Sequence, residues 1–396
     1  MGNNRLDDLL DSFILQGVPG CSLSVTLHGK TVYTGYRGYA RLEDNCKVDQ
    51  STIFQLFSNT KNLTTTAVMR LYEKGLIALN DPISNYLPYF KDSKFQTFNG
   101  SSEIQIEPVT HPITIENLLT MTSGIPSPGK GSLTQFEYVE KIPNPYKMTT
   151  TELARKISEI PLEFDPGSHW HYGLGYEILG ALIEAVSGKT FGAFLKDEIF
   201  DPLEMDHTTF LYKNEMAPNL AAVYFVKDGC QTRMNIMPRM TEDNGNLCES
   251  GGGGLISTLE DMTHFVTMWA MGGEWKGHRI LSRDTIDLIR ENHLSGSAME
   301  DFRKIGTDTW PWYKGYGWGL GVRTLINRAE AGSNGSLGEF GWCGAGGTYS
   351  LVDPSRELGV MYMHSIFPVS TQGYFHPRIR NVVYSMLDEW ESSNGD

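Results

Sequence analysis

The sequence has few cysteines, no surplus of positive charge and no long apolar run over its 396 residues. The cysteines number five and are widely spaced, which excludes a complete disulfide framework and a zinc knuckle. A net charge of −14 predicts neither a nucleic-acid partner nor an anionic membrane partner. No apolar run is long enough to span a membrane, and the first twenty residues carry Asp7, Asp8 and Asp11, unlike a signal peptide. We expect a soluble cytoplasmic protein.

Several familiar catalytic motifs are missing as well. There is no HExxH, and the tightest histidine group, "HWH" at 169–171, offers too few ligands for a metal. The stretch "GYGWGLG", 315–321, lacks the Lys-Ser/Thr of a phosphate loop and is typical of a glycine-bearing strand. No Gly-x-Ser-x-Gly surrounds a serine, which disfavours the α/β-hydrolase fold. We therefore expect no metal and no cofactor. The composition does not distinguish a monomer from an oligomer.

A possible nucleophile stands in "FQLFSNTKNLTTTAVMRLYEKG", residues 54–75. Its apolar residues recur at helical spacing from Leu63 onward, and Gly75 is a natural stop. Residues three apart lie on one face of a helix, so Ser58 and Lys61 should meet. A serine hydroxyl needs a base to take its proton, and a lysine buried enough to lose its charge can serve.

The chain contains a second Ser-x-x-Lys, at Ser127 and Lys130. Pro128 and Gly129 lie inside that spacing and predict a turn, so the two side chains should not stack. The spacing is common by chance. The alternative for Ser58 is a helix N-cap followed by a solvated lysine.

Strand pairs are predicted near both ends of the chain. "CSLSVTLHGKTVYTGYRGYARL" alternates around a short turn, and "GGTYSLVDPSRELGVMYMHS" does the same around Asp353-Pro354-Ser355. A mainly helical middle lies between them, and the last segment, "HPRIRNVVYSMLDEWESS", has helical periodicity. The simplest architecture is an α/β (α+β) fold: an antiparallel sheet from both termini, flanked by helices, with an inserted helical lobe.

The expected division is a discontinuous sheet lobe, 1–56 plus 255–396, and a mainly helical lobe, 57–254, together forming one catalytic unit. A site is expected in the cleft between them. Two stretches, 91–110 and 296–314 with Trp310-Pro311-Trp312, are expected to be long loops or lids. The tract Ser250-Gly251-Gly252-Gly253-Gly254 should permit close backbone packing.

Five segments in order resemble one superfamily. "FSNTKNLTTTAVMRLYEKGLIALNDPISNYLP" resembles the nucleophile helix of serine β-lactamase-like and penicillin-binding proteins, and "ITIENLLTMTSGI" the segment that follows in their class C-like branch. "PGSHWHYGLGYEILGALIEAVSGKTF" and "GGGGLISTLEDMTHFVTM" resemble later segments of that branch. "GWCGAGGTYSLVDP" is similar to the third motif of family VIII carboxylesterases. The resemblance implies a β-lactamase-like fold.

The resemblance also assigns roles to residues. Ser58 matches the nucleophile, Lys61 its lysine partner and Tyr172 the tyrosine of the second motif. The N–H groups of Ser58 and Ala345 would form the oxyanion hole. Four residues would contact the substrate. They are Trp342, Cys343 and Gly344 of the third motif, and Leu174, two residues after Tyr172.

Three residues depart from the β-lactamase pattern. Leu174 stands where β-lactamases have asparagine, Cys343 replaces the usual Gly or Thr, and Asn59 is polar where the family is often apolar. A shift of one residue would bring His171 rather than Tyr172 into the second motif. A buried inert thiol remains the alternative for Cys343, and a core tyrosine the alternative for Tyr172.

The resemblance implies a serine hydrolase of the carboxylesterase kind that forms an acyl-enzyme on small-molecule esters or amides, with Lys61 and Tyr172 sharing the base role. The alternatives are an acyltransferase, D-amino-acid peptidase or β-lactamase on the same scaffold, and a non-catalytic penicillin-binding-like sensor or binding domain. Trp342 and Leu174 supply neither a cation nor an amide for a β-lactam, so esters should be preferred unless Arg323 or Lys314 replaces the missing cation.

Overall fold

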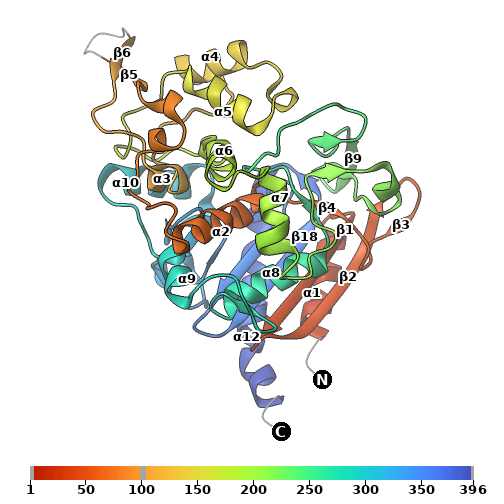
Figure 1. The fold of residues 1–396 in the computed structure, drawn as a ribbon. Coiled ribbons are helices and arrows are strands. Elements are labelled where there is room, and N and C mark those ends of the chain that lie inside the picture. Colours follow the sequence, from red (N-terminus) through yellow and green to blue (C-terminus); the bar gives the residue numbers. More distant parts are fainter. Residues whose placement is uncertain (1–3, 99–103, 394–396) are drawn as a thin grey trace.

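The fold is built on one antiparallel sheet to which both ends of the chain contribute (Figure 1). The structure is a computed structural model that describes residues 4–98 and 104–393. Across the sheet its eight strands are, in spatial order, β14 (Tyr316–Trp318), β15 (Arg323–Leu325), β16 (Phe340–Gly341), β17 (Tyr349–Asp353), β18 (Leu358–His364), β1 (Gly20–Leu27), β2 (Lys30–Arg41) and β3 (Cys46–Lys47). The predicted sheet from both termini is confirmed, because β1 pairs directly with β18.

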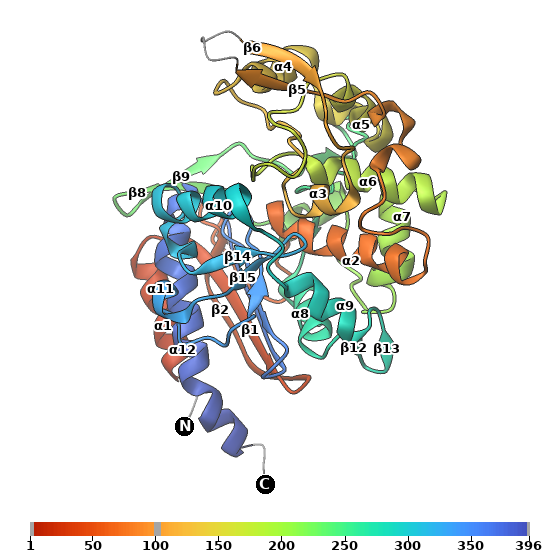
Figure 2. The same ribbon diagram turned by 90° about the vertical axis from the view of Figure 1, so that its left-hand side faces the viewer.

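Helices cover both faces of this sheet, which explains why every residue of β1 is buried. Alternate side chains of a strand point to opposite faces. On one face Thr26 receives a hydrogen bond of 3.0 Å from Thr267 of α8 (Leu259–Ala270). On the other, Phe13 of α1 (Asn4–Leu15) packs on Tyr362 of β18 and on Phe375 of α12 (Gln372–Ser393). Figure 2 shows α1 and α12 on one side of the sheet and α8 on the other.

The predicted helical middle is also present, above the sheet in Figure 1. Its helices are α2 (Thr60–Glu73), α3 (Ile115–Leu119), α4 (Leu133–Lys141), α5 (Thr150–Ser158), α6 (Gly175–Ser187) and α7 (Phe191–Leu195), which continues as a π-helical turn (Lys196–Phe200). Thr114 and Thr149 cap α3 and α5 with reciprocal capping boxes. The boundaries between the two expected lobes stay a prediction.

Smaller elements complete the described chain. The short strands are β4 (Phe54–Gln55), β7 (Leu211–Tyr212), β8 (Val223–Lys227), β9 (Cys230–Met234), β10 (Met240–Thr241), β11 (Ile256–Ser257), β12 (Glu274–Trp275), β13 (His278–Arg279) and β19 (Ile366–Phe367). The remaining helices are α9 (Arg283–Arg290) and α11 (Arg328–Ala331).

Both stretches expected to be loops contain regular structure, so that expectation is wrong. Residues 91–110 hold a hairpin of β5 (Lys94–Phe98) and β6 (Ile104–Pro108); residues 99–103 lie outside the described part. Every residue of β6 is exposed, so no buried face marks the strand in the sequence. Residues 296–314 hold α10 (Gly296–Asp308) and a 3₁₀ turn (Pro311–Tyr313). Glycines at both ends of α10 obscure its pattern, although Met299 and Phe302 are buried at helical spacing.

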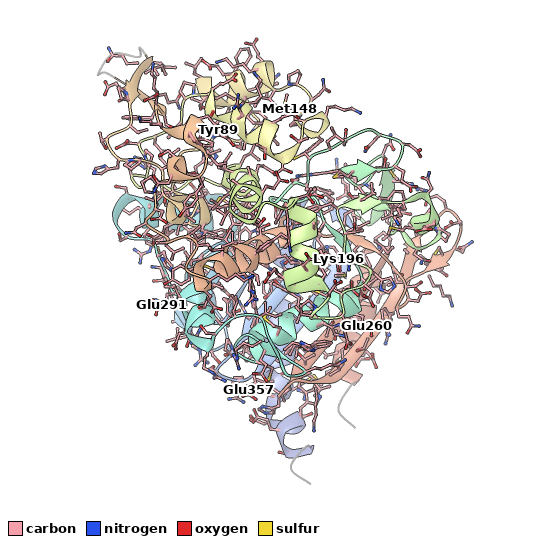
Figure 3. The ribbon with its side chains drawn as sticks, viewed as in Figure 1. Tyr89, Met148, Lys196, Glu260, Glu291 and Glu357 are labelled. Carbon is pink, nitrogen blue, oxygen red and sulfur yellow. The ribbon has the colours of Figure 1, made fainter. Side chains whose placement is uncertain are left out.

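The charged residues Lys196, Glu260 and Glu291, which Figure 3 labels, are exposed. Among the described residues, no single helix is long and apolar enough to cross a membrane. One pair, Gly175–Ser187 with Phe191–Phe200, meets that test of length and composition only when joined across a bend of 76°.

A buried network of polar side chains attaches the start of α2 to the sheet. Asn59 donates to Thr348 at 3.0 Å and accepts from Ser350 of β17 at 3.0 Å. Asn62 donates to both Asn59 and Ser350, each at 2.9 Å. Ser350 also accepts the backbone N–H of Trp342 at 3.0 Å. A buried polar group is costly without a partner, so this network holds the Ser58 turn in one position against residues 342–350.

We predict that Asn59→Ala destabilises the fold. The change removes one hydrogen bond each from the buried groups of Asn62, Thr348 and Ser350, which should lower the free energy of unfolding by about 2–4 kcal/mol. Chemical denaturation of the purified variant measures this. Asn235→Ala is the matched control because Asn235 is exposed, and we expect a change below about 0.5 kcal/mol. Equal stability of the two variants would contradict the structural role of the network.

Candidate active site

Ser58 lies in a tight turn directly before the helix that carries Lys61. The helix predicted from Ser58 begins instead at Thr60, and Phe57–Asn59 form a 3₁₀ turn. Phe57 has a φ of 47°, in the left-handed region that is strained for a non-glycine residue, and its ring packs edge-on against Phe367. The turn leaves Ser58 partly exposed and its Oγ 3.2 Å from Lys61 Nζ.

The amine of Lys61 is almost completely buried, with 4% of the residue exposed. Nζ donates to the carbonyl of Gly252 at 2.5 Å and lies 4.9 Å from the ring centre of Tyr172 and 5.6 Å from that of Tyr176. Burial lowers the pKa of Lys61 to about 7, because the charged form loses its hydration. Above about pH 7 the uncharged amine therefore predominates and can accept a proton from Ser58.

An ion pair between buried Glu177 and partly exposed Arg239 shifts the pKa of Lys61 in two directions. The carboxylate of Glu177 raises the pKa of Lys61, whereas the guanidinium of Arg239 lowers it. Glu177 on α6 is buried, accepts from Ser250 Oγ at 2.7 Å and lies 3.7 Å from Arg239. Sequence reasoning missed both residues, since nothing in the spacing of 177 and 239 predicts that they meet near Lys61.

The tract 250–254 supplies the carbonyl that holds Lys61. A Cβ on Gly251 would lie 2.4 Å from the carbonyl oxygen of Tyr176, and one on Gly252 would lie 2.7 Å from Glu177. Only glycine allows the backbone to approach the lysine this closely. The expected close packing of this tract is therefore what the structure has.

Tyr172 shares a cavity with Ser58, and its phenol is protonated at neutral pH. Trp342 Nε1 donates to Tyr172 Oη at 2.9 Å. Burial raises the pKa of Tyr172 above its usual range, and the hydrogen bonds with Ser58 and Trp342 only partly oppose this. His171, the alternative in a shifted register, instead pairs with Glu163 and lines a different hollow.

The shared cavity has a volume of about 100 Å³, and none of its lining residues carries a charge. It is lined by Ser58, Tyr172, Trp310, Trp312, Tyr313, Trp342, Cys343, Ala345, Val369 and Gln372. The backbone N–H of Ala345 has no hydrogen-bond partner among the described residues, so it is free to serve as an oxyanion donor. Pockets for whole ligands are usually a few hundred Å³, so this one fits a small apolar group.

Two of the expected substrate contacts lie outside the cavity lining. Gly344 packs under the motif, where a Cβ would lie 2.2 Å from the carbonyl of Leu56. Leu174 stands at the N-terminus of α6 and is partly exposed. Gly344 is thus required for close approach of two backbones rather than for contact with a ligand.

Sequence reasoning did not place two parts of the cavity lining at the site: Gln372, and the aromatic wall formed by Trp310, Trp312 and Tyr313. The wall comes from the stretch 296–314, which was expected to be a loop or lid, and its cluster of aromatic residues was the one signal in the sequence. Tyr313 stacks on Trp342 with ring centres 5.4 Å apart, and its Oη lies 3.0 Å from Cys343 Sγ. Burial raises the pKa of Cys343 to about 11, so the thiol stays protonated.

The other candidate groups have structural surroundings. Ser127 and Lys130 lie in an irregular segment with Lys130 exposed, so no helix stacks them. His169 pairs with Asp301 at 2.8 Å. Within residues 4–98 and 104–393, no group of three or more His, Cys, Asp or Glu side chains could hold a metal.

A sheet formed by both termini, with Ser58 and Lys61 at the start of a buried central helix, defines a β-lactamase-like fold. The chain belongs to the Beta-lactamase family, whose model matches residues 6–381.

Known proteins resemble the chain over most of its length. Protein Rv1367c of Mycobacterium tuberculosis is 27% identical over 332 residues, covering 82% of this chain and 80% of its own. The structure of EstCE1, a hydrolase with promiscuous acyltransferase activity, superposes with a TM-score of 0.77 at 22% identity, over 96% of this chain and 98% of EstCE1. A family VIII carboxylesterase superposes with a TM-score of 0.72 at 18% identity, over 97% of each chain. At these identities the two structures support the fold, and the suspected superfamily is confirmed.

We predict that the pH dependence of Ser58 reactivity follows Lys61. The rate of reaction with a fluorophosphonate should fall about tenfold per pH unit below about pH 7, because protonated Lys61 cannot accept the serine proton. Glu177→Gln should move this limb to lower pH, since it removes the charge that raises the pKa. Arg239→Gln should move it to higher pH. Shifts in the same direction for both variants would contradict the assignment of the limb to Lys61.

Proposed function

We propose that the protein is a serine hydrolase of the carboxylesterase kind, acting through an acyl-enzyme on ester bonds of small molecules. The observation that carries this proposal is a buried Lys61 amine 3.2 Å from Ser58 Oγ, beside an uncharged cavity that Ser58 lines. An activated hydroxyl beside an apolar pocket suits attack on an uncharged carbonyl compound.

In the acylation step, Ser58 Oγ attacks the ester carbonyl carbon while its proton passes to Lys61 Nζ. The carbonyl oxygen gains the negative charge and receives hydrogen bonds from the N–H groups of Ser58 and Ala345, each worth about 3–4 kcal/mol in such sites. The C–O bond to the alcohol then breaks. Tyr172, which is protonated, gives its proton to the leaving oxygen and is reprotonated from Lys61.

Deacylation reverses these proton transfers with water as the nucleophile. Water attacks the acyl carbon while its proton passes through Tyr172 to Lys61; the bond from the acyl carbon to Ser58 Oγ then breaks, and Oγ takes the proton back from Lys61. The raised pKa of Tyr172 and the lowered pKa of Lys61 support the lysine as the resting base and the tyrosine as the relay.

Three kinds of alternative function would use the same site. An acyltransferase replaces water with an alcohol or amine; EstCE1 combines hydrolase and acyltransferase activity, which supports keeping this alternative. A D-amino-acid peptidase or β-lactamase would need a group for the substrate's carboxylate, which the uncharged cavity lacks. A non-catalytic sensor has no need of a neutral lysine beside its serine.

All five cysteines are free thiols, which supports a cytoplasmic setting.

We predict one covalent adduct, at Ser58. Intact-mass spectrometry after treatment with a fluorophosphonate should show a single modification and parallel loss of p-nitrophenyl butyrate hydrolysis. Ser58→Ala should lose the adduct and about 10³-fold or more of kcat. Ser127→Ala is the matched control and should keep both. Labelling that persists in Ser58→Ala would refute the assignment, and absence of both labelling and ester turnover in the wild type would favour the non-catalytic sensor.

We predict that esters are hydrolysed much faster than β-lactams. Trp342 stands where β-lactamases carry the lysine of the third motif. Neither Arg323 nor Lys314 lines the cavity in its place. Arg323 is 1% exposed and donates a hydrogen bond to the carbonyl of Ser350, and Lys314 is exposed. Losing a charge-assisted hydrogen bond to a carboxylate should cost about ten- to a hundredfold in binding. The measurement compares kcat/KM for an unactivated alkyl butyrate and for a chromogenic cephalosporin. Equal or faster cephalosporin turnover would replace the carboxylesterase proposal with a β-lactamase one.

A further inference from the structure

Gln372 is a buried polar residue of the Ser58 cavity that the proposed mechanism does not use. It is the first residue of α12, far from Ser58 in the sequence, and only 1% of it is exposed. A Cβ on the adjacent Gly373 would lie 2.6 Å from the indole of Trp312. The start of α12 therefore packs directly against the aromatic wall, which holds Gln372 at the cavity.

The orientation of the Gln372 amide is fixed by its neighbours. Nε2 donates to the carbonyl of Gly344 at 2.7 Å and approaches that of Ala345 at 3.4 Å. Both neighbours are acceptors, so turning the amide over would bring oxygen against oxygen. The amide nitrogen therefore faces the carbonyls of residues 344–345, and the N–H of Ala345, which belongs to the same peptide unit as the Gly344 carbonyl, is the proposed oxyanion donor.

The same contact leaves the other end of the amide unpaired. Gln372 Oε1 is buried and has no hydrogen-bond partner among the described residues. Two other polar groups of the cavity are paired, Tyr172 with Trp342 and Cys343 with Tyr313, whereas the indole N–H of Trp312 has no partner among the described residues either. A buried acceptor is costly unless a donor reaches it, and no donor of the described residues lies within hydrogen-bond reach of Gln372 Oε1.

We propose that Gln372 determines substrate specificity, with Oε1 accepting a hydrogen bond from an O–H or N–H group of the substrate. The inference rests on the proposed ester hydrolysis and narrows its substrate class. The preferred substrates carry a small, otherwise apolar group with one hydrogen-bond donor beside the ester. The Nε2 contacts meanwhile hold residues 344–345 in place, so one amide positions the oxyanion donor and selects the substrate.

The test compares pairs of esters that differ only by a hydroxyl in place of a methyl group. Three pairs place the hydroxyl at acyl C2, at acyl C3 or at C2 of the alcohol, which distinguishes a donor on the acyl side from one on the leaving side. Each kcat/KM is divided by the hydroxide-catalysed rate of the same ester to remove intrinsic reactivity. In at least one pair the wild type should favour the hydroxyl ester by roughly ten- to a hundredfold.

Gln372→Met removes the acceptor with little change in size. Both members of every pair should slow because residues 344–345 lose their support, and the preference for the hydroxyl ester should fall to about one. Gln231→Met is the control, since Gln231 on β9 does not line the cavity, and it should keep the wild-type preference.

Three outcomes are decisive. A wild-type ratio near one in all three pairs overturns the inference even if Gln372→Met fails to fold, because the ratio needs no variant. A preference that survives in Gln372→Met also overturns it and assigns Oε1 to a water molecule. Absence of all ester turnover would instead refute the proposed function; Ser58 labelling by alkyl phosphonates with and without the hydroxyl would then still report the preference.

Discussion

The candidate site depends on the burial of one amine. Lys61 can act on Ser58 only in its neutral form, and water would keep that amine charged at neutral pH. The structure removes the water by placing Tyr172 and Tyr176 over Nζ and by giving it a carbonyl, Gly252 O, in place of a carboxylate. Glu177 lies far enough back to moderate the pKa without fixing the charge.

That burial requires the central helix to be held firmly in place. Asn59 and Asn62 attach the start of α2 to Ser350 of the sheet, while Ser350 also holds the backbone of Trp342. The serine turn and the third motif are therefore fixed to the same hydroxyl. A displacement of the serine turn would therefore also displace the third motif, because several hydrogen bonds of a buried polar network are lost together. The polar Asn59, unusual for the family, is explained by this attachment.

An aromatic wall lines the cavity that Ser58 shares. Trp310 and Tyr313, from the segment after α10, pack on Trp342, and Trp312 packs on Tyr313; the cavity is small and uncharged. Aromatic rings favour apolar groups and cannot balance a carboxylate. Gln372 interrupts this apolar lining with a single unpaired acceptor. The proposed preference for uncharged esters within the Beta-lactamase family rests on this lining.

The sequence by itself determined the local and periodic features. Alternation predicted the hairpins β1–β2 and β17–β18, and the helical spacing of Ser58 and Lys61 predicted their meeting, because both depend on residues close along the chain. It did not predict α10 or the β5–β6 hairpin, where glycines or an exposed face hide the pattern. Only the tertiary structure brought Gly252, Glu177, Arg239 and Gln372 to the site. Each lies more than a hundred residues from Lys61 in the chain. Their effects arise from burial and Coulomb interaction through space, which no sequence spacing encodes.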